Sequence, residues 1–119
     1  MSKLVQNWAE AISTKDPRKM IELYAPDALL IPTFDQILKG RKKIYPYFVE
    51  FLDKKDMKCT IIKNEHLTLG DEFMTCSGYY KFEFIDEAGI DEMVLARYTY
   101  IFNKDGKIIV HHSSEQPVD

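Results

Sequence analysis

The side chains with the most varied chemistry in this chain lie near its end, in the segment IIVHHSSEQP. His111, His112, Ser113, Ser114 and Glu115 follow one another there without a break. Imidazole, hydroxyl and carboxylate groups can transfer protons, bind metal ions or take part in nucleophilic catalysis. The segment therefore raises three hypotheses: an active site, a metal site, or the polar end of a strand.

The spacing argues against a metal site and a nucleophilic triad. Neighbouring side chains on a strand point to opposite faces, so His111 and His112 hold one metal ion together only if a bulge intervenes. His66 lies in a different segment, and the two cysteines lack a CxxC or other metal spacing. We therefore expect no metal and no cofactor. No GxSxG motif is present, and each serine is too close in sequence to the histidines for a triad. One histidine could still face a cavity as a proton carrier or donor; alternatively, both are structural.

Arg97 is the most unusual charged residue, because it interrupts the apolar and aromatic segment MVLARYTYIF. A guanidinium group in such a strand is costly unless it is paired. It could bind an anionic ligand on a cavity wall, or it could form a cross-strand ion pair with Glu83, Glu115 or Asp91. Both interpretations stand at this stage. The Asp105-Gly106 turn predicts that Arg97 lies opposite Ser114, with His112 on the same face, which favours His112 over His111 as its cavity partner.

Composition and charge limit the class of protein. The chain has 119 residues, of which 45% are apolar and 29% charged, and its net charge is −3. This length suits a single domain over residues 1–119. The negative charge and the scattered basic residues argue against a nucleic-acid partner. No apolar stretch approaches the length of a membrane span, and the first residues show no signal pattern, so we expect no membrane partner and a cytoplasmic location.

Hydrophobic periodicity predicts helices first and strands later. Leu4, Trp8, Ala11 and Ile12 form the apolar face of one helix, and Asp16-Pro17 begins a second helix that includes Tyr24. Residues 28–32 and a short piece near Leu38 are expected to be strands, and a third helix follows Gly40. Four strands with period two come next, over about 59–69, 73–85, 92–103 and 107–115. Gly78 predicts a bend or bulge within the second of these.

This order, α-α-β-β-α-β-β-β-β, predicts an α+β fold in which a curved antiparallel sheet wraps around N-terminal helices as a cone. Here the sequence resembles the nuclear transport factor 2-like (SnoaL-like, cystatin-like fold) superfamily. The segments AISTKDPRKMIELYAPDALLIPT, ARYTYIF, KDGK and HHSSEQP resemble small bacterial proteins related to the association domain of calcium/calmodulin-dependent protein kinase II. The resemblance implies a cone-shaped domain, a cavity closed by helices, and a homodimer formed through the open sheet face.

The residues also indicate a partner for the sheet. The strand around Arg97 is apolar on both faces, and helices can cover only one of them, which favours a homodimer; a larger ring remains open. We assign Tyr98 and Tyr100 to the outer, dimer-forming face.

Two functions compete. The first is a homodimeric assembly module, or one that binds a small organic ligand in a partly apolar cavity. The second is a SnoaL-like lyase or isomerase that uses general acid–base chemistry without a cofactor. The candidate ligand-binding residues are Arg97, His112, His111, Ser114, Tyr24, Tyr80 and Trp8, although the aromatic ones are more often core residues.

Overall fold

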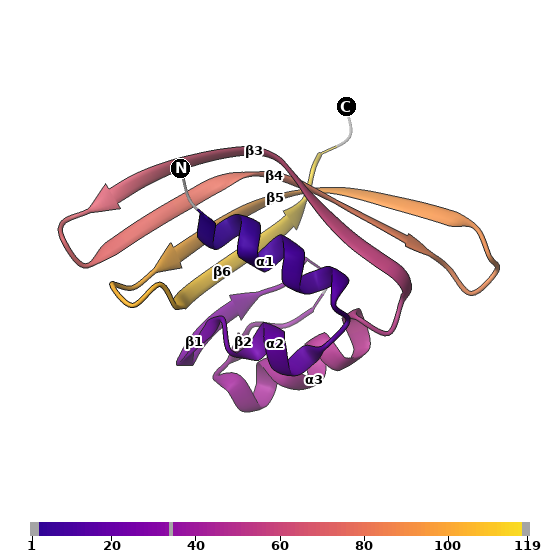
Figure 1. Cartoon of the computed structure of the whole chain (residues 1–119), viewed down its shortest axis with the longest axis horizontal. Helices are drawn as coiled ribbons and strands as arrows, with labels where there is room; N and C mark the ends of the chain where they lie inside the picture. The colour runs from indigo at the N-terminus through magenta and orange to yellow at the C-terminus, as the bar shows by residue number, and fades with distance from the viewer. Residues whose placement is uncertain (1–2, 34, 118–119) are drawn as a thin grey trace.

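The computed structural model describes residues 3–33 and 35–117. In this part of the chain the element order confirms the predicted one, with helices on one side of a curved sheet (Figure 1). The helices are α1 (Lys3–Ser13), α2 (Pro17–Ile21) and α3 (Arg41–Phe51). The strands are β1 (Tyr24–Ile31), β2 (Leu38–Lys39), β3 (Lys55–Leu69), β4 (Phe73–Ile85), β5 (Asp91–Phe102) and β6 (Ile108–Glu115).

The six strands form one sheet in the order β2-β1-β6-β5-β4-β3. Strands β3 to β6 are the predicted antiparallel meander, and the predicted short strand β2 pairs antiparallel with β1. The pairing of β1 with β6 is parallel, which the sequence did not indicate. No hairpin joins these two strands, because α3 and four strands lie between them in sequence, so the chain is free to bring them together in either direction.

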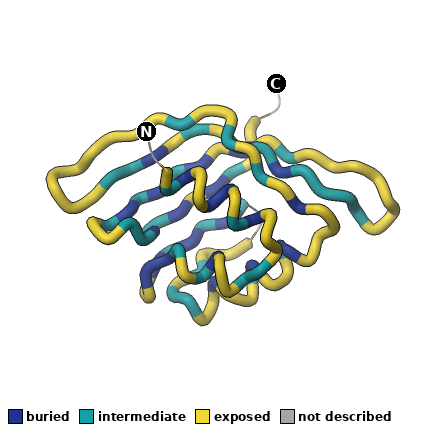
Figure 2. Tube along the Cα trace, viewed as in Figure 1, coloured by how far each residue is buried: buried dark blue, intermediate teal, exposed yellow. Residues whose placement is uncertain are grey.

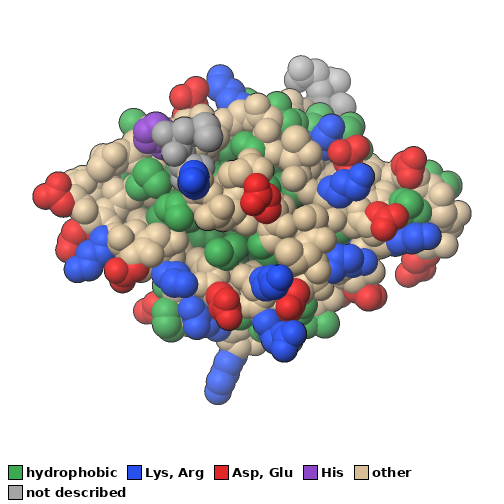
Figure 3. All heavy atoms as spheres, in the orientation of Figure 1, with side chains coloured by type: hydrophobic (Ala, Val, Ile, Leu, Met, Phe, Trp, Pro, Cys, Tyr) green, Lys and Arg blue, Asp and Glu red, His purple; other side chains and the backbone are tan. Residues whose placement is uncertain are grey.

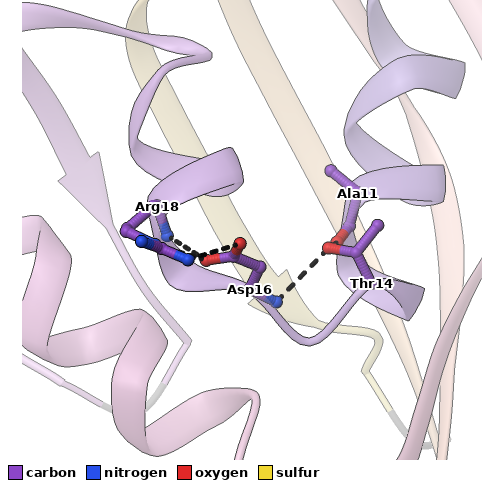
Figure 4. A network of polar contacts seen from close by, with 4 residues as sticks. All are labelled: Ala11, Thr14, Asp16 and Arg18. Atoms are coloured by element: carbon purple, nitrogen blue, oxygen red, sulfur yellow. Dashed lines mark hydrogen bonds and ion pairs between the residues drawn. The ribbon is translucent and has the colours of Figure 1, made fainter.

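The turn between α1 and α2 explains how the second helix begins (Figure 4). The Asp16 carboxylate accepts a hydrogen bond from the Arg18 backbone N–H at 2.9 Å, and Pro17 is the first helical residue, as predicted. The Thr14 hydroxyl donates to the Ala11 carbonyl and accepts from the Asp16 backbone N–H. The hydrogen bonds from Arg18 lower the pKa of Asp16. This helix ends at Ile21, so the prediction that Tyr24 belongs to it is wrong: Tyr24 begins β1.

The core lies between the helices and the concave face of the sheet, where buried residues follow the central strands (Figure 2). Ala96, Tyr98, Tyr100 and Phe102 of β5 point into it, and Tyr98 and Tyr100 are only 3% and 0% exposed. Their assignment to an outer, dimer-forming face is therefore wrong. A strand that is apolar on both faces does not reveal in its sequence which face the helices cover, and in this protein they cover the face that carries the larger aromatic rings.

Gly78 lies where β4 passes a bulge in β3. The register between the two strands shifts between Ile61 and Lys63, as predicted for a bent sheet. A Cβ atom on Gly78 would overlap the carbonyl oxygen of Lys63. That oxygen accepts a hydrogen bond from the Tyr98 hydroxyl at 3.0 Å. The glycine therefore allows β3 to approach closely and the sheet to curve around the helices.

Candidate functional site

A cavity of about 380 Å³ opens between the helices and the concave face of the sheet. Its walls are mostly aromatic, and its polar side chains gather in two places. Thr33, Tyr80, His111 and Ser113 lie on the sheet side, whereas Asp35, Glu50 and Lys54 are exposed. The remaining lining residues come from α1, β1, α3, β4 and β5 and the segments beside them: Trp8, Leu30, Pro32, Tyr47, Phe48, Phe51, Phe82, Phe84, Val94 and Ala96.

His111 is the centre of a buried hydrogen-bond network. Its Nδ1 lies 2.8 Å from the Tyr24 hydroxyl, and its Nε2 lies 3.2 Å from the Tyr80 hydroxyl. The Trp8 indole N–H donates to the Tyr24 oxygen at 3.0 Å. At the other end, the Tyr80 hydroxyl donates to Ser113 Oγ at 2.6 Å, and the Thr33 hydroxyl donates to the same oxygen at 3.2 Å. Helix α1 and strands β1, β4 and β6 are thus joined through one imidazole.

The directions of these hydrogen bonds assign the tautomer of His111. Because the Trp8 indole can only donate, the Tyr24 oxygen accepts from it and the Tyr24 hydrogen is free to point at Nδ1. Nδ1 then accepts, and Nε2 carries the proton and donates to the Tyr80 oxygen. The opposite tautomer would leave the hydrogen of Tyr24, which is fully buried, without an acceptor. The neutral Nε2–H form satisfies every contact.

Burial holds this network in its uncharged form. It lowers the pKa of His111 to about 3, with a smaller contribution from His112, so that the imidazole is neutral at physiological pH. Burial also raises the pKa of the Tyr24 and Tyr80 hydroxyls. Burial and the nearby Asp35 carboxylate raise the pKa of Tyr47 to about 12. The cavity therefore offers neutral donors and acceptors on an aromatic surface.

The structure brings together four of the seven residues predicted for the site. Trp8, Tyr80 and His111 line the cavity, and Tyr24 lies behind His111 as its hydrogen-bond partner. The tyrosine and tryptophan side chains also pack in the core, as their spacing predicted. Tyr100 stacks on the imidazole with ring centroids 4.1 Å apart, although its own buried hydroxyl has no hydrogen-bond partner among the described residues.

The other three predicted residues, Arg97, His112 and Ser114, lie on the opposite face of the sheet. The predicted register is confirmed, since Arg97 pairs with Ser114. Arg97 and His112 are nevertheless exposed, and neither lines the cavity. Their placement on the cavity wall is wrong, as is the preference for His112 over His111, because both followed from the inverted choice of face for β5. The ion pairs found among the described residues, Arg18–Asp16, Lys63–Glu65 and Lys81–Glu83, do not include Arg97.

The sequence missed Thr33 and Ser113 as site residues. The sequence suggests only a nucleophilic role for Ser113, and its position next to His112 argues against that role. Period two on β6 places it on the same face as His111, which is the signal that could have found it. Thr33 follows β1, and only the parallel pairing of β1 with β6 brings it to Ser113.

Three other features of the described residues bear on the kind of site. No group of three or more histidine, cysteine, aspartate or glutamate side chains within residues 3–33 and 35–117 is arranged to hold a metal ion. Within the same ranges, no helix is long and apolar enough to span a bilayer. Positive and negative side chains are mixed over the face seen in Figure 3, without a large patch of one sign.

Comparison with solved structures defines the class of protein. The chain is similar to a nuclear transport factor 2-like superfamily protein from Salmonella enterica, with a TM-score of 0.85, 13% identity, and coverage of 98% of this chain and 88% of that one. It is also similar to a protein with a cystatin-like fold from Caulobacter vibrioides, with a TM-score of 0.81, 19% identity, and coverage of 97% and 86%. The chain therefore has the nuclear transport factor 2-like, cystatin-like fold, as the sequence predicted.

The particular family follows from two closer matches. The model of the calcium/calmodulin dependent protein kinase II association domain matches residues 1–117. A candidate association domain of this kind from Xanthomonas campestris is 38% identical, with a TM-score of 0.89, and the match covers 98% of this chain and 85% of that one. The chain belongs to the calcium/calmodulin dependent protein kinase II association domain family, and it is a small assembly or ligand-binding module. No curated protein sequence matches it.

Proposed function

We propose that this protein forms a homodimer through the outer face of its sheet and holds a small organic molecule in the cavity on the inner face. The observation that carries the ligand-binding part is a cavity of about 380 Å³ with aromatic walls and one neutral polar network around His111. Cavities that bind small molecules have this composition and a volume of roughly 300–1,000 Å³.

The outer face supports the dimer. Tyr79 on β4 and Met93 and Leu95 on β5 are 39%, 56% and 36% exposed, so two neighbouring strands present large apolar side chains to solvent on this face. A second copy of the chain is the natural cover, because most soluble oligomers are closed homo-oligomers. The solved relative from Xanthomonas campestris is described as an association domain, which is consistent with self-assembly.

The lyase or isomerase alternative finds less support in the geometry. General acid–base catalysis requires a group that can exchange a proton with the substrate near neutral pH. Both nitrogens of His111 are occupied by tyrosine hydroxyls, and burial keeps the pKa of His111 at about 3. The carboxylates of the cavity, Asp35 and Glu50, are exposed, and neither is hydrogen-bonded to the buried network among the described residues. Binding is therefore the function that we propose.

Two matched substitutions on β5 separate ligand binding from assembly. Ala96 is buried and lines the cavity, so Ala96→Phe should fill the cavity and abolish binding of α-methylstyrene, an apolar probe, followed by methyl NMR. Leu95→Glu, on the neighbouring residue and the opposite face, should convert the dimer to a monomer in light scattering and leave probe binding unchanged. If wild-type protein does not bind the probe, the cavity function is wrong. If the wild type is monomeric at micromolar concentration, the dimer is wrong.

A further inference from the structure

The hydrogens of the buried network do not all find acceptors within residues 3–33 and 35–117, the described part of the chain. Six hydrogens belong to it, one each from Trp8, Tyr24, His111, Tyr80, Thr33 and Ser113. The network contains five hydrogen bonds for these six hydrogens: Trp8 to Tyr24, Tyr24 to His111, His111 to Tyr80, Tyr80 to Ser113 and Thr33 to Ser113. When each contact takes one hydrogen, one hydrogen is left over. With the directions given above, it is the hydroxyl hydrogen of Ser113.

The unused hydrogen lies at the cavity. Ser113 is 9% exposed and lines the cavity, and its oxygen already accepts from both Tyr80 and Thr33. The hydroxyl can rotate only so as to direct its hydrogen away from those two donors. A buried donor without an acceptor is unfavourable, so an occupant of the cavity that accepts a hydrogen bond at Ser113 removes this cost.

The charge of the surroundings indicates what kind of acceptor fits. No arginine or lysine is among the buried residues of the described chain, and the imidazole is neutral. An anionic group beside Ser113 would therefore lose its hydration without meeting a cation. The charged residues on the cavity, Asp35, Glu50 and Lys54, are of mixed sign and do not select an anion. An uncharged acceptor such as a carbonyl oxygen meets the site without this penalty.

The walls indicate the body of the ligand. Trp8, Tyr80 and Phe82 pack against one another with ring centroids 4.6 to 6.1 Å apart, and all three line the cavity. Aromatic surfaces of this kind bind another aromatic ring through stacked or edge-to-face contacts. We propose that the cavity takes an uncharged aryl carbonyl compound, whose ring lies among these side chains and whose carbonyl oxygen accepts the Ser113 hydroxyl hydrogen. This inference rests on the ligand-binding function proposed above.

Three probes of similar size test the proposal by titration calorimetry. Acetophenone carries the neutral carbonyl, α-methylstyrene replaces that oxygen by a CH₂ group, and benzoate carries a charged acceptor. Acetophenone should bind about threefold to tenfold more tightly than α-methylstyrene, the usual contribution of one neutral hydrogen bond, and benzoate should bind more weakly than acetophenone.

Substitutions at Ser113 locate the hydrogen bond. Ser113→Ala should remove the preference for acetophenone over α-methylstyrene and leave the affinity for α-methylstyrene nearly unchanged, which also reports that the variant is folded. Ser113→Cys keeps a side chain of similar size in place, so the ligand cannot move up to the Tyr80 hydroxyl, but the thiol is only a weak donor. This variant should therefore also lose the preference for acetophenone. Ser114→Ala, the adjacent residue on the outer face, should retain the full preference.

The outcomes separate this inference from the function on which it rests. Failure of every probe to bind overturns both. Three outcomes overturn the aryl carbonyl proposal alone and leave a cavity that binds apolar molecules. Acetophenone and α-methylstyrene bind equally, benzoate binds most tightly, or the preference for acetophenone survives both Ser113 substitutions.

Discussion

Protonation of His111 should make this protein lose stability well above the pH at which most proteins unfold in acid. In the unfolded chain a histidine binds a proton with a pKa near 6.5, whereas in the folded protein burial lowers the pKa of His111 to about 3. Between these two values the unfolded state holds more protons than the folded state. The free energy of unfolding is therefore at its full value above pH 6.5, and it falls as the pH drops toward 3.

The size of the effect follows from the two pKa values. At pH 5 the solution lies about 1.5 pH units below the pKa of the unfolded state. Each unit is worth about 1.36 kcal/mol, so the free energy of unfolding is about 2 kcal/mol lower at pH 5 than at pH 7.5. By pH 3 the same group would account for a loss of about 4 to 5 kcal/mol, a large part of the stability of a typical domain. The window from pH 7.5 to 5 is the useful one, because most carboxylates stay ionised across it.

Urea unfolding followed by circular dichroism at pH 7.5 and pH 5 measures this loss. His111→Gln keeps a polar side chain but cannot titrate, so its free energy of unfolding should be lower at pH 7.5 and should change little between the two pH values. His112→Gln, on the exposed neighbour, should retain most of the wild-type loss. If His111→Gln loses as much stability as the wild type on acidification, His111 is not the group responsible, and a buried neutral imidazole is the wrong description of the network.

Two further substitutions test the sheet. Gly78→Ala places a Cβ against the Lys63 carbonyl and should lower the free energy of unfolding by about 2–3 kcal/mol. The control Ser77→Ala, on the exposed neighbour, should change this free energy by less than about 1 kcal/mol. Equal effects of the two substitutions in urea unfolding would contradict the close approach of β3. Arg97→Met should change stability by no more than about 0.5 kcal/mol, because Arg97 is exposed and absent from the ion pairs of the described residues; unfolding of this variant in a thermal melt would show that the arginine has a structural partner.

The order of the elements could be predicted because each part of it follows from local chemistry. The Asp16-Pro17 pair begins α2, period two continues through β3 to β6, and the Asp105-Gly106 turn fixes the pairing of Arg97 with Ser114. These signals depend on neighbours in sequence, and the fold bore them out. Gly78 likewise indicated an irregularity of the sheet, which the structure places in the neighbouring strand β3, since a glycine inside a strand is unfavourable unless another chain segment approaches it.

The candidate site was harder to predict because it depends on which face of β5 the helices cover. Residues 93–102 offer apolar side chains on both faces, so the sequence pattern alone allowed either choice. The sequence prediction places Arg97 on the cavity face and Tyr98 on the outer face. The same inversion of faces selects His112 and Ser114 for the cavity, where the structure has His111 and Ser113. Tyr98 and Tyr100 are more buried than Met93 and Leu95 because they pack against Tyr80 and Trp8. These contacts join distant parts of the chain, so no local sequence pattern predicts them.

A crystal structure of the protein grown with acetophenone tests the central claim most directly, because it shows both the occupant of the cavity and its hydrogen bond. We expect the ring among Trp8, Tyr80 and Phe82, and the carbonyl oxygen about 2.7–2.8 Å from Ser113 Oγ, with the contacts of His111 to Tyr24 and Tyr80 unchanged. An empty cavity at saturating acetophenone, with the ligand absent or bound elsewhere on the surface, would contradict the account.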